Sequence, residues 1–568
     1  MGNDEKIGYN PMSEGIPLER ELIVIAKREA GLRATREGVA SFEGVDVTSL
    51  AGLLASEDVS LVPLFGTSEE RLKYKAASLA PETGIEVLDL SIYYRVKAPD
   101  EKLDELAERF LQMDVIEAAY VKPLGEPPIV PDDPSRGLND MLPSMEEPPV
   151  VTPDFTNRQS YLNPAPVGID AHYAWNLPGG KGKGIKIIDC EWGWNFTQED
   201  LLQNQMGVVV GTSSPSDNHG TAVLGIISGD HNTFGISGIC PEAIVGAASF
   251  VGKSSAHTIV EAANKLGPGD ILLLEIHRRG PNGGGGGQQG YIAIEWWPDD
   301  FLAIQYAISR GIIVVEAAGN GWENLDDPLY DTPDTGFPSW WKNPFNTANP
   351  NSGAVMIGAG SPPAGTHGRN ISPWNLPYID RARCGFSNWG ERIDAQGWGW
   401  EVTSTGYGNL QGGPNRNEWY TDTFSGTSSA SPIVVGALGC VQGVLRAQGE
   451  SLLTAERART LLRMTGSSQQ DAPERPRTQR IGNRPNLRQL IPSIAKVWHH
   501  NTIVRMTYVT DATQSAWAYI NELGWRRIKS CSPDSVTNMF QACCTAVANS
   551  RNVHIYADGI YIYRVILL

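Results

Sequence analysis

Three short segments carry side chains that together could activate a nucleophile. They hold Asp189 in I-I-D-C, His219 in D-N-H-G-T-A and Ser428 in S-G-T-S-S-A-S-P. A serine hydroxyl attacks a carbonyl carbon once a base removes its proton, and imidazole can be that base because it titrates near neutrality. A carboxylate would fix the imidazole tautomer and stabilise its cation. The three residue types therefore predict acyl-transfer chemistry at Ser428, with His219 as base and Asp189 as its partner.

A fourth segment, V-V-E-A-A-G-N, places Asn320 directly after an apolar run. Its side-chain amide would donate a hydrogen bond to an oxyanion, beside the backbone N–H of Ser428. That N–H is available because Ser428 opens an apolar helical pattern that continues to Leu445. An isolated G-T-S is more often an ordinary helix cap, so the combination of segments indicates catalysis rather than any one of them.

The elements that must position these side chains alternate between strand and helix patterns from Val167 to about Pro492. Short apolar runs end in Asp189 and just before Asn320, and helical stretches separate them. Buried strands that alternate with helices predict a mainly parallel sheet covered on both faces. Because sites in such sheets lie beyond the carboxyl ends of the strands, Asp189 and Asn320 are expected at one edge.

The flanking segments differ in pattern from this central part. After a flexible N-terminus (residues 1–20), residues 21–121 show two strand-helix-strand patterns, which predict a small α+β domain. Residues 122–165 are rich in proline and acidic side chains and predict an exposed linker open to proteolysis. Strand patterns around one helix predict a small β-rich module over residues 496–568.

Composition narrows the classes of partner and compartment. The net charge of −18 argues against nucleic acid or an anionic membrane as a partner. Met1–Glu21 lacks the apolar run of a signal peptide or a membrane span, and the seven cysteines lack paired short spacings. The expectation is a chain without a membrane span or disulfide framework, either cytoplasmic or exported without a leader.

Together, the four segments resemble those of the subtilisin-like serine peptidases. The resemblance rests on H-G-T at His219 and G-T-S-S-A-S-P at Ser428, with F-S-N-W-G and I-G-N-R-P-N-L further along, and it covers residues 166–493. It implies a three-layer α/β domain and hydrolysis of protein or peptide substrates through an acyl-enzyme. It also implies an Asp189, His219 and Ser428 triad with Asn320 in the oxyanion hole, and no cofactor for the chemistry.

The sequence departs from the family pattern at two places in the site. After Asp189, the residues Cys190, Glu191 and Trp192 intervene before a glycine where the family has one small residue. The substrate-binding strand has Glu275, Ile276 and His277 in place of small residues, with Gly319 expected across the pocket. A charged wall made by Glu275 and His277 would favour a polar or basic substrate side chain.

The resemblance also suggests a structural calcium site. The matching ligands are one upstream carboxylate and four positions of a loop: Asp200, Asp230, Asn232, Phe234 and Ile236. Calcium prefers such oxygen ligands. A glycine-turned loop with a solvated asparagine is an equally weighted alternative.

For the flanks, the resemblance implies a self-processing precursor. Residues 21–121 look like the ferredoxin-like pro-segment of the family, with the processing site in the linker, and the alternative is an unrelated accessory domain. The C-terminal module is similar to the OB-like binding subunits of bacterial AB-type toxins, so Trp517, Tyr519 and Trp525 could stack on a glycan or lie in the core. The alternative for the whole chain is a protein that binds a protein or glycan without cleaving it.

Overall fold

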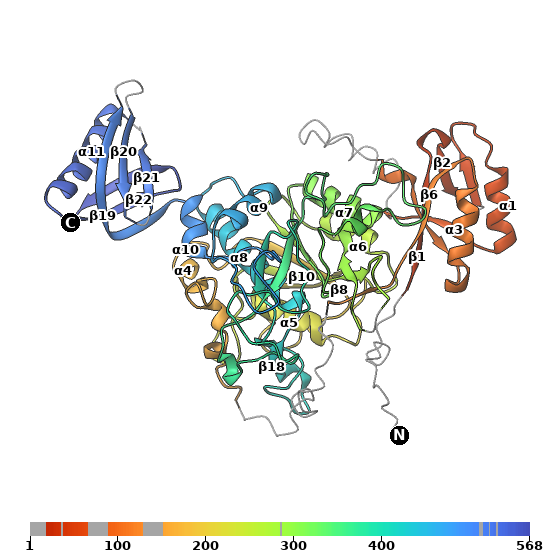
Figure 1. Cartoon of the computed structure of the whole chain (residues 1–568), viewed down its shortest axis with the longest axis horizontal. Coiled ribbons are helices and arrows are strands. Elements are labelled where there is room, and N and C mark those ends of the chain that lie inside the picture. The colour runs from red at the N-terminus through yellow and green to blue at the C-terminus, as the bar shows by residue number, and fades with distance from the viewer. Residues whose placement is uncertain are drawn as a thin grey trace.

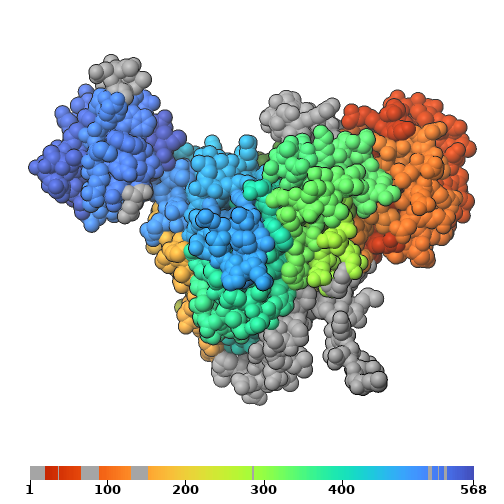
Figure 2. Space-filling model, in the orientation of Figure 1, coloured from red at the N-terminus to blue at the C-terminus, as the bar shows by residue number. Residues whose placement is uncertain are grey.

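The computed structural model describes residues 19–35, 38–65, 89–128, 151–284, 287–510, 515–521, 523–529 and 532–568. The chain forms three bodies along its longest axis: an N-terminal domain, a central domain and a C-terminal barrel (Figure 1). The N-terminal domain lies broadly against the central domain, whereas the barrel joins it through a narrow neck (Figure 2). The expected flexible N-terminus lies almost wholly outside the described residues, as do the middle of the expected linker and the start of the strand expected before Val96.

The central domain is built on a seven-stranded sheet whose neighbouring strands are all parallel, in the order β16-β15-β14-β11-β8-β10-β9. Its strands are β8 (Lys186–Glu191), β9 (Gln205–Val210), β10 (Ile244–Ser249), β11 (Ile271–Leu274), β14 (Ile313–Ala317), β15 (Val355–Gly360) and β16 (Ala395–Trp398). Apolar residues fill both faces of the inner strands because helices cover each side. The predicted three-layer α/β architecture is confirmed.

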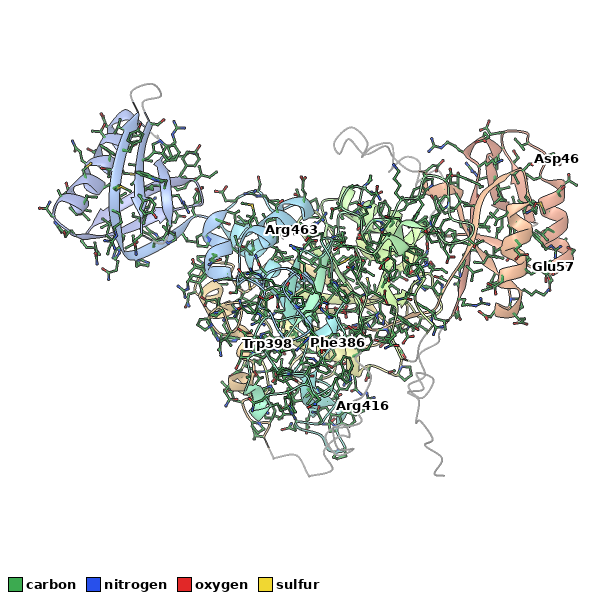
Figure 3. All side chains as sticks on the ribbon, in the orientation of Figure 1. Asp46, Glu57, Phe386, Trp398, Arg416 and Arg463 are labelled. Carbon is green, nitrogen blue, oxygen red and sulfur yellow. The ribbon has the colours of Figure 1, made fainter. Side chains whose placement is uncertain are left out.

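Two pairs of helices form the outer layers. Helices α5 (Asn218–Ser228) and α8 (Thr427–Ala447) cover one face, and α6 (Ser255–Ala263) and α7 (Pro298–Ser309) cover the other. Strand side chains alternate between the two cores, so Ile187 packs with α5 and α8 while Ile188 packs with α6 and α7. Phe386 and Trp398, which lie inside the central domain in Figure 3, are fully buried in the first core.

Smaller elements complete the central domain. They are α4 (Ala171–Trp175), α9 (Ala455–Met464), α10 (Leu487–Leu490), the pair β12 (His277–Arg279) and β13 (Tyr291–Ala293), and the hairpin β17 (Val402–Thr405) and β18 (Tyr420–Phe424). Among the described residues, α8 alone is long and apolar enough to cross a membrane, and its apolar window is completely buried in the domain. It is therefore a core helix in this fold.

In its described residues, 19–35, 38–65 and 89–122, the N-terminal domain has an antiparallel four-stranded sheet and two α-helices. Its elements are β1 (Glu21–Ala26), α1 (Thr48–Glu57), β4 (Ser60–Pro63), β5 (Tyr93–Lys97), α3 (Leu103–Leu111) and β6 (Ile116–Lys122), with a hairpin of β2 (Leu32–Thr35) and β3 (Gly38–Ser41). The order β4-β5-β1-β6, with a helix after β1 and after β5, is the ferredoxin-like arrangement. Leu103, Leu106 and Phe110 bury one face of α3 against this sheet, as their helical spacing predicts.

The C-terminal module is a closed five-stranded barrel in the order β19-β20-β21-β23-β22, with β21 and β23 parallel. Its elements are β19 (Val497–Thr510), β20 (Ser515–Ile520), β21 (Gly524–Ile528), α11 (Pro533–Ala548), β22 (Asn552–Ala557) and β23 (Tyr561–Leu567). Five strands that close in this way match the OB-like expectation.

The segment expected to be an exposed linker is anchored at both of its ends. Lys122 is fully buried, and Gly125–Glu126 forms β7, which pairs with β12 of the central domain. At the other end, Phe155 N donates to Gly235 O at 2.7 Å, and Gly235 N donates to Pro153 O at 2.7 Å. Residues 129–150 lie outside the described part of the chain.

Candidate active site

The site lies where β8, β11 and β14 end and where α5 and α8 begin. His219 is the second residue of α5, and Ser428 is the second residue of α8. The residue before α8, Gly426, has a φ of 101°, and a β-carbon there would come within 2.3 Å of the Pro128 carbonyl oxygen. Glycine is therefore required on two counts, and the resulting close approach brings another part of the chain against Ser428.

The carboxylate that contacts His219 is Glu191 and not Asp189. Glu191 Oε2 lies 2.6 Å from His219 Nδ1, whereas Asp189 Oδ2 accepts a hydrogen bond from Trp194 Nε1 at 2.7 Å. This corrects the assignment from sequence. Asp189 and Glu191 are two residues apart on β8 and so point to the same face, but Glu191 is the last residue of the strand and reaches the start of α5.

A sequence signal for Glu191 was present. The family pattern expected after the acid is one residue and then glycine, and it is Glu191-Trp192-Gly193 that has this spacing. Asp189 attracted the assignment because it follows the apolar run directly. Since β8 extends two residues further, that run does not mark the end of the strand.

Three buried carboxyl groups share this end of the sheet. Burial raises the pKa of Asp189, Glu191 and Glu275 well above their ordinary values. The negative charge of Glu191 raises the pKa of Asp189 further, and that of Asp189 does the same for Glu275. Cys190 between them is fully buried, and burial holds its pKa well above the usual range, so its thiol is in the unreactive state.

Ser428 and Asn320 meet at one carbonyl oxygen, that of Pro128. Ser428 Oγ donates to it at 3.1 Å, and Asn320 Nδ2 donates to it at 2.6 Å. The other end of the amide is fixed, since Asn320 Oδ1 accepts from Thr427 N at 3.0 Å. The predicted hydroxyl and amide therefore converge on a peptide carbonyl of the same chain, and this carbonyl was not expected from the sequence.

The segment before Pro128 lies along β12 as an added antiparallel strand. In this pairing, Glu126 is opposite His277 and Gly125 is opposite Arg278. Backbone pairing of this kind is a general mode of peptide binding. The strand with the predicted substrate-binding residues thus does hold a peptide segment.

The side chains predicted to form a charged wall do not do so. Glu275 turns into the domain, where Ser431 Oγ donates to it, and its raised pKa disfavours the charged form. Ile276 is buried beside Gly125. His277 accepts a hydrogen bond from Asn320 N at 3.3 Å on Nδ1, and burial lowers its pKa to about 3, so the ring is neutral. Gly319, with a φ of 97°, brings its backbone against that ring. The preference for a basic side chain has no support in this geometry.

The comparisons with known proteins agree with this geometry. The family model for peptidase S8, the subtilase family, matches residues 211–483, a range that includes His219, Asn320 and Ser428. An intracellular serine protease from Paenibacillus polymyxa is 24% identical over 316 residues, which are 52% of this chain and 78% of that protein. Subtilisin Savinase from Lederbergia lenta is 24% identical over 266 residues, which are 46% of this chain and 77% of that protein.

Residues 211–483 therefore form a domain of the subtilase family. Its catalytic class is accordingly that of a subtilisin-like serine peptidase, which needs no cofactor for the chemistry. Among solved structures, fervidolysin from Fervidobacterium pennivorans, described as a keratinolytic enzyme related to subtilisin, aligns with 90% of this chain at 16% identity and a TM-score of 0.46. The alignment spans 65% of the fervidolysin chain. The family match begins after β8, so the identity of the acid in this subtilase rests on the Glu191 contact.

The predicted calcium ligands of this subtilase form a hydrogen-bonded cluster that does not suit a cation. Asp200 Oδ1 accepts from Asn232 Nδ2 at 2.6 Å, and its Oδ2 accepts from Ile236 N at 2.7 Å and from the Tyr420 hydroxyl at 2.9 Å. Three donors thus surround the carboxylate where a cation would need further oxygen atoms.

Two other members of the set, Asn232 and Asp230, already accept hydrogen bonds from backbone N–H groups. Asn232 Oδ1 accepts from Phe234 N at 3.0 Å, and Asp230 accepts from Leu202 N and Gln203 N. Burial raises the pKa of Asp200 to about 7, which disfavours its charged form. In the part of the chain described, no group of three or more His, Cys, Asp or Glu side chains is arranged to hold a metal ion.

Proposed function

We propose that this subtilase is a serine endopeptidase in which Ser428, His219 and Glu191 act as the triad, and that it is made as a precursor that cuts itself after Pro128. The observation that supports this best is the shared contact of Ser428 Oγ and Asn320 Nδ2 with the Pro128 carbonyl oxygen. A nucleophile and an oxyanion donor on one carbonyl are what acyl transfer requires.

The reaction begins with attack of Ser428 Oγ on the carbonyl carbon while its proton passes to His219. Asn320 Nδ2 and the Ser428 backbone N–H, at the positive end of α8, stabilise the oxyanion. The carbon–nitrogen bond then breaks, and His219 gives its proton to the departing amine. A water molecule, deprotonated by His219, attacks the acyl-enzyme and releases the carboxyl product. Throughout, Glu191 Oε2 holds the imidazole in place through its contact with His219 Nδ1.

The contacts of the N-terminal domain support its role as the pro-segment. Lys122, the last residue of β6, lies 2.5 Å from Asp299 Oδ2 on α7 and donates to Ser255 Oγ on α6 at 3.0 Å. The Tyr120 hydroxyl donates to Asp299 at 2.9 Å. From these contacts at the end of β6 the chain continues into β7, which pairs with β12, and then to Pro128 at Ser428. The domain therefore positions the residues up to Pro128, and these residues occupy the site where a separate substrate would bind.

The test is to follow purified full-length protein over time by mass spectrometry and N-terminal sequencing. The expected product begins at Ile129, and Ser428→Ala should remain at 568 residues. Ser429→Ala is the matched control, because the Ser429 hydroxyl donates to the carbonyls of Trp398 and Gly426 and not to that of Pro128. A fluorophosphonate probe should label processed wild type at Ser428. Processed protein that takes no label would contradict the peptidase proposal, and a stable active full-length chain would contradict self-processing.

For the barrel, the proposed role is binding of a glycan through exposed aromatic rings. Trp525 is 42% exposed, and its ring centre lies 5.6 Å from that of Tyr519 in an edge-to-face arrangement. Trp517 on the same strand as Tyr519 is half-buried. Trp525→Ala should abolish binding of full-length protein to an oligosaccharide array, and equal binding by the variant would refute this role.

A further inference from the structure

Residues Gly125–Pro128 show which side chains this cleft accepts in a bound peptide. Counted back from the carbonyl that Ser428 contacts, Pro128 is the first residue, Glu126 the third and Gly125 the fourth. Backbone pairing with β12 sets this register. A separate peptide that binds in the same way would meet the same side chains of the central domain. The inference rests on the proposed function, since it assumes that this carbonyl marks the bond to be cut.

The third residue, Glu126, has a carboxylate that two side chains of the central domain bind directly. The Tyr291 hydroxyl donates to Glu126 Oε1, and Gln288 Nε2 donates to Oε2 at 3.3 Å and to the Pro127 carbonyl at 2.9 Å. Glu126 is 8% exposed, and Gln288 and Tyr291 are almost fully buried. Arg279 adds positive charge nearby, with its guanidinium 5.9 Å from the centre of the Tyr291 ring.

These contacts match a carboxylate better than a neutral side chain. A buried carboxylate needs donors on its oxygen atoms, and hydrogen bonds to an ionised acceptor are stronger than those between neutral groups. Tyr291 offers a donor on one oxygen and Gln288 on the other. A glutamine in place of Glu126 would turn an amide nitrogen towards one of these donors.

The fourth residue, Gly125, fits because it has no side chain. A β-carbon at this position would come within 2.6 Å of Ile276 Cδ1 and 3.2 Å of Arg278 Cζ. Neither neighbour can move away easily. Ile276 is 1% exposed within the core, and Arg278 Nη2 donates to Ser255 Oγ of α6 at 2.9 Å.

We propose that the processed subtilase selects peptides with glutamate at the third residue and glycine at the fourth residue before the bond it cuts. Tyr291 and Gln288 bind the glutamate carboxylate through hydrogen bonds. Ile276 and Arg278 leave no space for a larger side chain at the fourth residue. The substrate class is therefore an acidic peptide segment that resembles the enzyme's own Gly125–Pro128.

The experiment compares kcat/KM for fluorogenic peptides on processed enzyme whose active fraction is counted with a fluorophosphonate. Gly-Glu-Pro-Pro-Ile-Val should exceed the peptide with glutamine in the third place roughly ten- to hundred-fold, the range for a hydrogen bond to a charged group. Replacing the glycine by phenylalanine should cost at least about tenfold, and Ile276→Ala should recover part of that loss because it opens space.

Tyr291→Phe removes only the hydroxyl and should lower the preference for glutamate over glutamine to a few-fold or less. Tyr508→Phe, at an exposed position of the barrel, is the matched control and should leave the preference unchanged. Equal rates on the glutamate and glutamine peptides with fully labelled enzyme would overturn the selectivity while leaving the peptidase intact. Enzyme that takes no label would instead refute the proposed function, and the selectivity with it.

Discussion

Two clusters of buried ionisable side chains, one at the interface with the N-terminal domain and one at the active site, differ in how their charge is balanced. At the interface with the N-terminal domain, Lys122 lies within 3.3 Å of carboxylate oxygens of Glu21, Asp299 and Asp300. Arg278 of β12 adds a second cation to this cluster. At the active site, Asp189, Glu191 and Glu275 are buried equally well, and in the described part of the chain none forms an ion pair with lysine or arginine.

The difference appears in the pKa values. Burial alone would raise the pKa of Glu21, but the charges of Lys122, Arg278 and Arg95 outweigh it, and the pKa is lowered. Burial, opposed by Lys122, raises the pKa of Asp300 only to about 6. The three active-site carboxyls pair with no lysine or arginine among the described residues. His219 lowers the pKa of Asp189 only in part, and the pKa of each carboxyl is raised well above its ordinary value. Lysine and arginine balance the carboxylates at the domain interface, whereas at the active site the carboxyls lie beside an imidazole, which Glu191 contacts.

The largest expected effect separates the two acids of β8. Glu191→Gln should lower kcat by about 10⁴-fold, the scale seen when the acid of a serine triad becomes an amide. Asp189→Asn is the matched control and should cost less than about tenfold, because Asp189 contacts Trp194 rather than His219. Peptide hydrolysis by processed enzyme measures both. A large loss in Asp189→Asn with near-normal activity in Glu191→Gln would restore the assignment made from sequence.

The second prediction breaks the paired cluster. Lys122→Met in the Ser428→Ala precursor should destabilise the docked N-terminal domain by about 3–5 kcal/mol, because it leaves Glu21, Asp299 and Asp300 buried without their shared cation. Denaturant titration of the precursor measures the loss.

The control for that variant is a lysine of the same domain at the surface. Lys102 pairs with Glu57 at 3.0 Å, but its side chain is 40% exposed, so Lys102→Met should cost less than about 1 kcal/mol. Similar losses for the two variants would show that burial of the ion pairs does not decide the strength of the interface.

The two clusters also show what sequence could and could not predict. Ser428, His219 and Asn320 were found because each stands in a local pattern, at the start of a helix or just after a buried strand. Glu191 was missed because period-two alternation places residues 189 and 191 on one face, and only the end of the strand decides between them. The parallel sheet was predictable from its apolar runs, whereas the hairpin of β2 and β3 has half-buried, mixed residues and gave no signal.

The pairing of β7 with β12 could not be predicted from the local composition of the sequence. The residues around Pro128 have the proline and acid content of a linker, yet β7 pairs with a strand about 150 positions further along the chain. Nothing within Gly125–Pro128 specifies that partner. The contacts that bind it, from Tyr291, Gln288 and Asn320, come from the central domain. The cluster around Lys122 was likewise not predictable, because its partners Asp299 and Asp300 lie far along the chain from Lys122.

A third prediction concerns the pH dependence of the unpaired cluster. Because the folded state raises the pKa of Glu275, it binds a proton more tightly than the unfolded chain does, so stability falls as pH rises from the unfolded value of about 4.3 towards the raised value. In the Ser428→Ala background, Glu275→Gln should remove this decline, so its stability relative to that background should increase from pH 5 to pH 8. Thermal unfolding across this range measures it, with exposed Glu101→Gln as the control. A gain that does not grow with pH would contradict the raised pKa.

The smallest expected effect is that of removing calcium. Among the described residues, neither a lysine or arginine nor an imidazole stabilises the buried carboxyl of Asp200. It accepts hydrogen bonds from three neutral donors, which are the Asn232 amide, the Ile236 N–H and the Tyr420 hydroxyl. Since these donors occupy the positions that a cation would need, a chelator should change the melting temperature by less than about 1 °C, whereas Tyr420→Phe should lower stability by about 1 kcal/mol through the lost hydrogen bond. A rise of several degrees on adding calcium would mean that the loop rearranges to bind the ion, and that the donors around Asp200 substitute for it only in its absence.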